Sequence, residues 1–179
     1  SGVSRPRSFT HDDILSLPSM SALPAIERAG NGRNFFQPSH GKKIPGTPWQ
    51  LGGIGVAEWT GVPLREVLER AGVKRTARDV MPEGLDQKRV KRPMPIDKAL
   101  ADDTLLVYAM NGQPLPPDHG FPMRVLVPGW VGIAHIKADA VIFDEIDWPF
   151  SSAALFSTDF HSRCVAPRTS TGSIWKWTR

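Results

Sequence analysis

The sequence has very little cysteine and no long hydrophobic run. Cys164 is the single cysteine among 179 residues, which excludes an internal disulfide and a site built from several thiolates. No apolar run approaches the roughly 20 residues needed to span a bilayer. No signal peptide begins the sequence, so we expect a cytosolic chain or one that has already been processed.

Several common catalytic motifs are also missing. The sequence contains no phosphate-binding loop of the Walker type and no G-x-S-x-G nucleophile elbow. The glycines at positions 52–55 lack the G-x-G-x-x-G spacing of a dinucleotide site. The histidines show no i, i+4 spacing for zinc. These absences exclude the best-known nucleotide, hydrolase and zinc chemistries.

Proline, glycine and positive charge are well represented. The chain has 17 Pro and 16 Gly, which favours many turns and a mixed architecture. Its net charge is +4 and its pI about 9.5. The basic clusters at positions 74–78 and 88–92 lack interleaved aromatics, so we interpret them as solvated faces rather than as a nucleic-acid site. Small anionic ligands are compatible with this charge.

The hydrophobic pattern predicts short helices and strands. Thr10 and Asp13 form a capping-box pattern, and Pro63 and Gly72 suit the two ends of a helix. We expect helices over 12–17, 63–71 and 95–101. We expect strands over 23–27 (broken by Pro24), 104–110, 124–127, 131–137 and 140–146. A hairpin is expected at 111–112 and a polar connection over 79–92. The irregular stretch 34–55 is expected to be an ordered, packed loop because it contains Phe35, Phe36 and Trp49.

Residues 118–137 concentrate the polar side chains that could bind a ligand. In the predicted strand 131–137, His135 and Lys137 share one face with Val131 and Ile133. The pattern fits either the polar ends of a surface hairpin or one wall of a pocket.

A second candidate lies in the turn at 29–33, with sequence Ala-Gly-Asn-Gly-Arg. Its backbone N–H groups could face an anion between Arg28 and Arg33, although Asn-Gly is also a common hairpin turn. Positive and donor groups together suit a large polyanionic ligand. This set comprises Arg28, Asn31, Arg33, His119, Arg124, His135 and Lys137.

Four sequence blocks occur in an order that resembles the molybdopterin domain of the sulfite oxidase family. They are AGNGR at 29–33, GGIGVAEWTGVPLREVL at 52–68, EGLD at 83–86 and AMNGQPLPPDHGFPMRVLVPGWVGIAHIK at 109–137. The resemblance covers about 5–137, with 138–179 divergent. It implies one α+β domain over 1–179 with mixed sheets and short helices, without the family's C-terminal dimerisation domain. It also implies a molybdenum–molybdopterin cofactor in a positively charged pocket.

The resemblance assigns roles to individual positions. It implies that Arg33 is the catalytic residue that helps to bind an oxyanion substrate. The implied pterin-binding residues are Asn31, Asp86, His119, Arg124, His135, Ile136 and Lys137. The implied reaction is oxidation of sulfite or a related sulfur oxyanion, with electrons leaving to a haem or cytochrome partner. Bacterial relatives favour the periplasm.

One departure from the family pattern concerns the metal. The family places a molybdenum-ligating cysteine where this chain has Arg28, and arginine offers no soft donor. Cys164 lies in the divergent region, as does Phe160, which stands loosely where the family has a tyrosine. Two alternatives therefore stay open: a silent relative that binds pterin or an oxyanion without turnover, and a purely structural domain.

Overall fold

The described part of the chain is built mainly from antiparallel sheets. The computed structural model describes residues 2–41, 44–84, 89–138 and 141–144, and all of them belong to one unit, Ser1–Asp147. Within these residues a six-stranded sheet has the order β1-β4-β7-β9-β10, with β8 paired to β7. Its strands are β1 (Met20–Ala22), β4 (Trp59–Pro63), β7 (Leu105–Met110), β8 (Gln113–Pro114), β9 (Met123–Leu126) and β10 (Lys137–Ala138).

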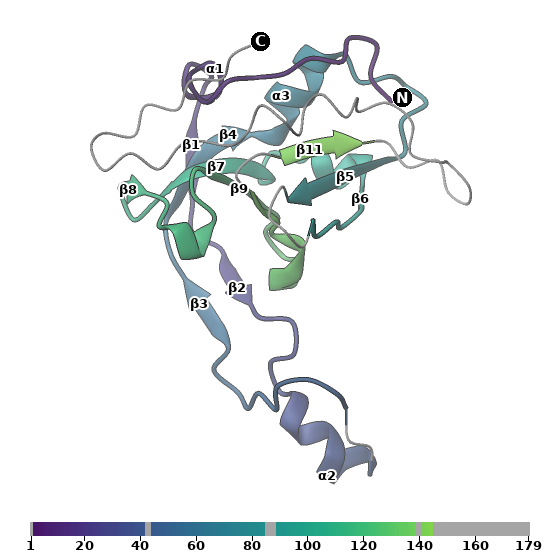
Figure 1. The fold of residues 1–179 in the computed structure, drawn as a ribbon, viewed down its shortest axis with the longest axis vertical. Helices are drawn as coiled ribbons and strands as arrows, with labels where there is room; N and C mark the ends of the chain where they lie inside the picture. Colours follow the sequence, from purple (N-terminus) through teal and green to yellow (C-terminus); the bar gives the residue numbers. More distant parts are fainter. Residues whose placement is uncertain (1, 42–43, 85–88, 139–140, 145–179) are drawn as a thin grey trace. The chain divides into compact units, whose positions relative to one another are not determined.

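Two smaller sheets accompany it. One has three strands in the order β11-β5-β6, and the other is the two-stranded ribbon β2–β3. Figure 1 shows β2 and β3 running side by side, with α2 beyond the end of the ribbon. Their bounds are β2 (Ala25–Glu27), β3 (Ile54–Val56), β5 (Asp79–Gly84), β6 (Met94–Pro95) and β11 (Val141–Asp144). The prediction of a single domain over 1–179 stays a prediction.

The helices are short. The α-helices are α1 (His11–Leu15), α2 (Phe36–His40), α3 (Leu64–Ala71) and α4 (Ile96–Ala99), and the 3-10 helices are η1 (Arg33–Phe35), η2 (Pro117–His119) and η3 (Gly132–Ala134). The capping box of α1 is present as predicted: the Thr10 N–H donates to the Asp13 carboxylate at 2.7 Å. Gly72 ends α3 in the left-handed conformation, with φ 73°, as expected of a C-cap glycine.

Strand β7 is central, and it has apolar neighbours on both faces. Leu106 packs in a cluster with Val62, Leu64 and other side chains of β4 and α3. Leu105 and Val107 point to the opposite cluster, which contains Trp59. Burial on both faces explains why the strand reads as a continuous apolar run. The predicted central strand and the hairpin at Asn111-Gly112 are therefore confirmed.

The predicted strand over 131–137 is wrong. Residues 132–134 form η3 instead, and β10 begins only at Lys137. Val131 and Ile133 are exposed, whereas Ala134, His135 and Ile136 are buried. The apparent alternation of polar and apolar residues therefore does not correspond to two faces of a strand.

Two further expectations are wrong. Residues 79–84 form strand β5 rather than a polar connection, and β5 pairs with both β6 and β11. The proline and charged residues of β5 interrupt the apolar pattern that would predict a strand. Phe35, Phe36 and Trp49 are 47%, 45% and 36% exposed, so their loop does not pack as expected.

Candidate functional site

A pocket of about 590 Å³ opens between the β2–β3 ribbon and the segment that carries η3. Glycines form much of one wall, and Arg28 and Lys137 supply positive charge. The lining residues are Ile26, Arg28, Ala29, Trp49, Gly52, Gly53, Ile54, Gly55, Gly132, Ile133 and Lys137.

Arg28 is held at the end of β2 by its backbone and by an aromatic ring. Its N–H donates to the Gly53 carbonyl at 2.7 Å. Its guanidinium lies 4.1 Å from the centroid of the Trp49 ring, a cation–π arrangement that fixes the group without neutralising it. Among the described residues, no carboxylate lies within ion-pair distance of Arg28. Its charge is therefore available to a ligand in the pocket.

The turn at 29–33 is stabilised by its own hydrogen bonds. The N–H groups of Asn31, Gly32 and Arg33 donate to backbone carbonyls at 2.9–3.0 Å. The Asn31 side chain accepts from Gly53 N–H at 3.0 Å and donates to Glu27 at 2.7 Å. These three amides are therefore committed within the protein, which favours a plain turn over the anion site that the sequence also allowed.

Arg33 is not among the residues that line the pocket. Its Nη1 donates to the Thr47 carbonyl at 3.2 Å, and its guanidinium fills the space beside Gly30 and Gly46. Its assignment as the substrate-binding residue stays a proposal.

The opposite wall approaches the ribbon closely at Gly132. A Cβ at this position would lie 2.9 Å from the Glu27 carbonyl oxygen and 3.4 Å from the Arg28 Cα, so only glycine fits without a shift. This approach brings η3 and Lys137 to the pocket that Arg28 also lines. The Lys137 ammonium donates to the Asp118 carbonyl. Burial, and then the charge of Arg124, lower the pKa of Lys137.

Arg124 lies behind this wall rather than on it. Its guanidinium donates to the carbonyls of His119 and His135 at 3.2 and 3.1 Å and lies 5.0 Å from the Trp59 ring centroid. It is 5% exposed, and burial lowers its pKa to about 10, which still leaves it charged at neutral pH. Its contacts tie η2, β9 and η3 together. His119 is exposed, with its ring tilted against Trp59.

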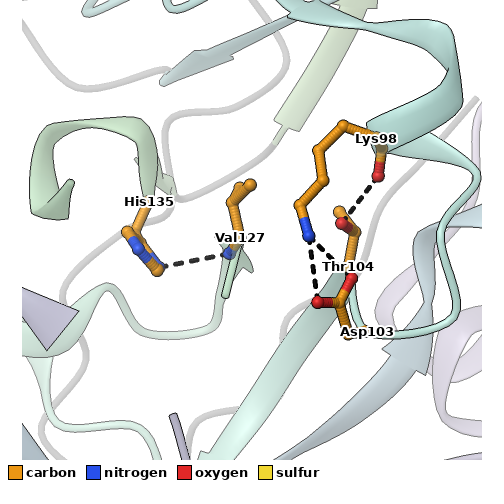
Figure 2. Close-up of polar contacts among 5 residues, drawn as sticks. All are labelled: Lys98, Asp103, Thr104, Val127 and His135. Carbon is orange, nitrogen blue, oxygen red and sulfur yellow. Dashed lines mark hydrogen bonds and ion pairs between the residues drawn. The ribbon is translucent and has the colours of Figure 1, made fainter. Parts of the chain in front are cut away.

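His135 is a buried neutral side chain. The Val127 N–H donates to its Nδ1 at 3.2 Å (Figure 2), so the proton resides on Nε2, which lies 3.2 Å from the Trp130 carbonyl oxygen. Burial lowers its pKa to about 4. Ile136, next in the chain, is buried in the core. Both residues hold the segment in place and do not line the pocket.

The structure thus brings together only part of the predicted set. Arg28 and Lys137 line the pocket, and Asn31 braces one wall. Arg33, His119, Arg124, His135 and Ile136 lie outside the lining. Asp86, Phe160 and Cys164 fall outside the described residues.

Sequence reasoning missed most of the wall. Ile26 and Trp49 lie outside the four sequence blocks, and Ile54, Gly132 and Ile133 lie inside them without an assigned role. The sequence feature that could have indicated them is the group of glycines and hydrophobic residues at positions 49–56. The missed lining residues are Ile26, Trp49, Ile54, Gly132 and Ile133.

Metal-binding clusters and membrane-spanning helices are both absent from the described residues. In the parts of the chain with described positions, no group of three or more His, Cys, Asp or Glu side chains could hold a metal ion. The same parts contain no helix with the length and apolar character required to cross a membrane.

Comparisons with known proteins agree on one family. Residues 1–141 match the family described as the oxidoreductase molybdopterin binding domain. Rat mitochondrial sulfite oxidase is 38% identical over 138 residues, which are 73% of this chain and 25% of the relative. The NADH nitrate reductase of Ulva prolifera is 35% identical over 148 residues, which are 75% of this chain and 17% of the relative.

A solved structure gives the same result for the fold. The crystal structure of the sulfane dehydrogenase SoxCD from Paracoccus pantotrophus has a TM-score of 0.67 and 34% identity, and the match covers 76% of this chain and 34% of that chain. The chain spans about a quarter of the length of the animal sulfite oxidases it matches. The predicted α+β fold and the family resemblance are therefore confirmed, and the chain belongs to the sulfite oxidase-type family of oxidoreductase molybdopterin-binding domains.

Proposed function

We propose that the pocket between the β2–β3 ribbon and η3 binds the anionic molybdopterin cofactor of a sulfite oxidase-type oxidoreductase. The single observation that supports this is the pair of cations, Arg28 and Lys137, that line the same glycine-rich pocket. Arginine and lysine complement phosphate charge, and glycines let a ligand approach the backbone closely. The described residues therefore fit the anionic part of the cofactor.

The same residues do not fit the metal's sulfur ligand. Arg28 stands where the resemblance places the cysteine, and Cys164 lies outside the described residues. A guanidinium has no lone pair to donate to a metal. In this chain the protein's part is to hold an anion by charge and to keep the pocket wall in place through Arg124 and His135.

The reaction proposed is oxidation of sulfite or a related sulfur oxyanion. When bound, the metal–pterin group would supply the redox chemistry, as is general for cofactor enzymes. The electron acceptor is proposed to be a haem or cytochrome, and the location the periplasm, both from the family resemblance. From the family resemblance, Arg33 is proposed to bind the substrate. The residues proposed to bind the cofactor, or to support the wall that binds it, are Asn31, Asp86, His119, Arg124, His135, Ile136 and Lys137.

A second function is favoured by the position of Arg28. A cation stacked on Trp49 at the ligand position of the metal suits a relative that binds pterin or an oxyanion without turnover. It would share the pocket and its charge with the enzyme, and would differ only in lacking the metal and the reaction.

The two functions are separated by molybdenum content and sulfite turnover. The full chain is produced in a host that makes the cofactor, and sulfite-dependent reduction of cytochrome c is measured beside the molybdenum content. Molybdenum together with turnover supports the enzyme. Pterin without molybdenum, with turnover gained only in Arg28→Cys, supports the silent relative. Absence of pterin, molybdenum and turnover in both proteins contradicts the enzyme and a silent relative that binds pterin.

A further inference from the structure

We propose that the loop at the end of the β2–β3 ribbon docks on the surface of an anionic lipid bilayer. The docking surface, which we call the loop patch, consists of the exposed side chains Phe35, Phe36, Ile44 and Leu51. None of the four lines the pocket, so this proposal goes beyond the cofactor site and does not depend on it. A surface of this kind recognises a hydrocarbon boundary covered by negative headgroups.

The stretch 34–56 receives almost no cover from the rest of the described chain. Apart from Gly53, every residue of the stretch whose exposure is described is exposed. Leu51 has the most exposed side chain of the loop patch, at 74%. Figure 1 shows α2, which begins at Phe36, beyond the end of the ribbon. Large apolar side chains gathered on one exposed segment mark a site of interaction with a partner or a membrane.

A turn at the base of the loop brings two patch residues together. The Gly32 N–H donates to the Gln50 carbonyl at 2.9 Å, which closes the loop. A Cβ at Gly32 would lie 3.8 Å from a ring carbon of Phe35 and 3.8 Å from a methyl carbon of Leu51. These two side chains are distant in sequence but lie beside the same glycine. They therefore form one apolar surface rather than two isolated contacts.

Positive charge without any acid favours a negative surface as the partner. Residues 28–57 contain four Lys or Arg and no Asp or Glu, whereas the whole chain has 22 Lys and Arg against 18 Asp and Glu. The rest of the chain therefore has 18 of each, so this stretch carries the whole net charge of +4. Negative headgroups attract basic residues that lie near them. A second copy of this chain would bring equal positive charge, which disfavours self-association at this surface.

A bilayer suits the loop patch better than an acidic protein does. Protein interfaces depend on matched shape and on hydrogen bonds between the partners, whereas a lipid surface accepts apolar side chains without either. The loop patch offers two aromatic rings and two branched aliphatic chains. Phe and Leu are typical of the apolar face that enters the boundary between headgroups and acyl chains, beside Lys and Arg that contact the headgroups.

Vesicle sedimentation tests the proposal. The full chain is mixed with vesicles of phosphatidylcholine alone, or with vesicles of equal parts phosphatidylcholine and phosphatidylglycerol. We expect the chain to bind the anionic vesicles at least about tenfold more tightly than the neutral ones. Raising the salt to about 0.5 M should weaken the binding at least about threefold, because salt screens the attraction to the headgroups.

Two matched double variants test the loop patch. Phe35→Ser combined with Leu51→Ser should bind anionic vesicles at least about tenfold more weakly, because two apolar side chains no longer leave water. Leu15→Ser combined with Leu23→Ser changes two leucines that are also exposed but lie outside the loop, and should stay within about twofold of wild type. Thermal unfolding midpoints near that of wild type establish that each variant is folded. Phe35→Ser alone, with an expected loss of about threefold, replaces the first double variant if that protein is unfolded.

Several outcomes overturn the proposal. Equal binding to neutral and anionic vesicles, or an equal loss in the two double variants, contradicts a role for the charge or for the loop patch. Binding to poly-glutamate without binding to vesicles assigns the loop to an acidic protein. A dimer in light scattering that dissociates when Phe35 and Leu51 are changed, without vesicle binding, assigns it to a second copy. Pterin content is measured on the same samples, so either this proposal or the proposed function can fail while the other stands.

Discussion

Three cations near the pocket have different surroundings, and their surroundings determine what each can do. Arg28 is exposed and stacked on one ring. Lys137 is exposed and anchored to one carbonyl. Arg124 is buried and donates to two carbonyls. We therefore assign ligand contact to the first two, and support of the wall to Arg124.

Removing Arg124 should destabilise the fold. Arg124→Met leaves the carbonyls of His119 and His135 without their donors, and the expected loss is about 3 kcal/mol of unfolding free energy. Urea unfolding at pH 7 measures it. Arg78→Met, at an exposed arginine, serves as the control and should change stability by less than about 0.5 kcal/mol. Equal effects in the two variants would contradict a wall-supporting role for Arg124.

His135 makes stability depend on pH. Its pKa is about 4 in the folded protein, below its ordinary value, so the unfolded chain binds the proton more readily. The stability is fully present above about pH 6.5 and is lost as pH falls toward 4, by up to about 3 kcal/mol. The charges of Arg124 and Lys98 also lower the pKa of His135.

The measurement compares two proteins. Unfolding free energies of wild type and His135→Asn are determined at pH 7 and pH 4.5. The wild type should lose more stability on acidification than the variant, because carboxylates titrate in both but the histidine titrates in one. The same loss in both proteins would show that His135 is not the group responsible.

At the scale of elements, close backbone approaches position the pocket and the sheet. Gly132 lets η3 meet the end of β2, and Gly61 lets β4 meet β7. A Cβ at Gly61 would lie 2.3 Å from the Leu106 carbonyl oxygen and 2.4 Å from the Val107 Cα. The pairing register of β4 and β7 also shifts between Thr60 and Gly61, which is the irregularity that this approach accommodates.

Gly61→Ala should therefore disturb the central sheet. Because the contact is with backbone rather than with a flexible side chain, we expect a loss of about 2–4 kcal/mol of unfolding free energy. Gly55→Ala is the matched control: it lies in β3, and a Cβ there meets nothing within 4 Å. Chemical denaturation of both variants checks this, and a Gly61→Ala protein as stable as Gly55→Ala would refute the close approach.

Some elements were predictable because local chemistry determines them. The helix over 64–71 has apolar residues at helical spacing and a glycine cap, and β7 has an uninterrupted apolar run between two turns. Strand β5 was not predictable, because buried Glu83 reads as polar until Arg89 and Lys91 are seen paired to it. Burial alone would raise the pKa of Glu83, but these two partners lower it overall.

The site was predictable only in part, because much of it depends on contacts between residues that are distant in sequence. Charge indicates Arg28, and charge together with the family resemblance indicates Lys137. The placement of Arg124 and His135 behind the wall depends on η3, whose alternating residues imitate a strand. The apolar residues of the ribbon and Trp49 belong to the site because the fold places them beside the pocket. Their sequence pattern alone does not indicate this.

At the scale of the whole molecule, most of the chain belongs to the family domain. The family match covers residues 1–141, and this chain corresponds to about a quarter of the animal sulfite oxidases. Its net charge of +4 favours anionic ligands generally. The pocket contains two of the positive charges, next to glycines, and we propose that it holds the pterin cofactor.

Pterin content tests that claim most directly. The full chain is purified from a cofactor-producing host, and bound pterin is released, oxidised and quantified by fluorescence, beside an Arg28→Gln, Lys137→Gln double variant. We predict stoichiometric pterin in the wild type and a loss of most of it in the variant. A wild-type protein without pterin, or a folded variant that retains all of it, would contradict the account.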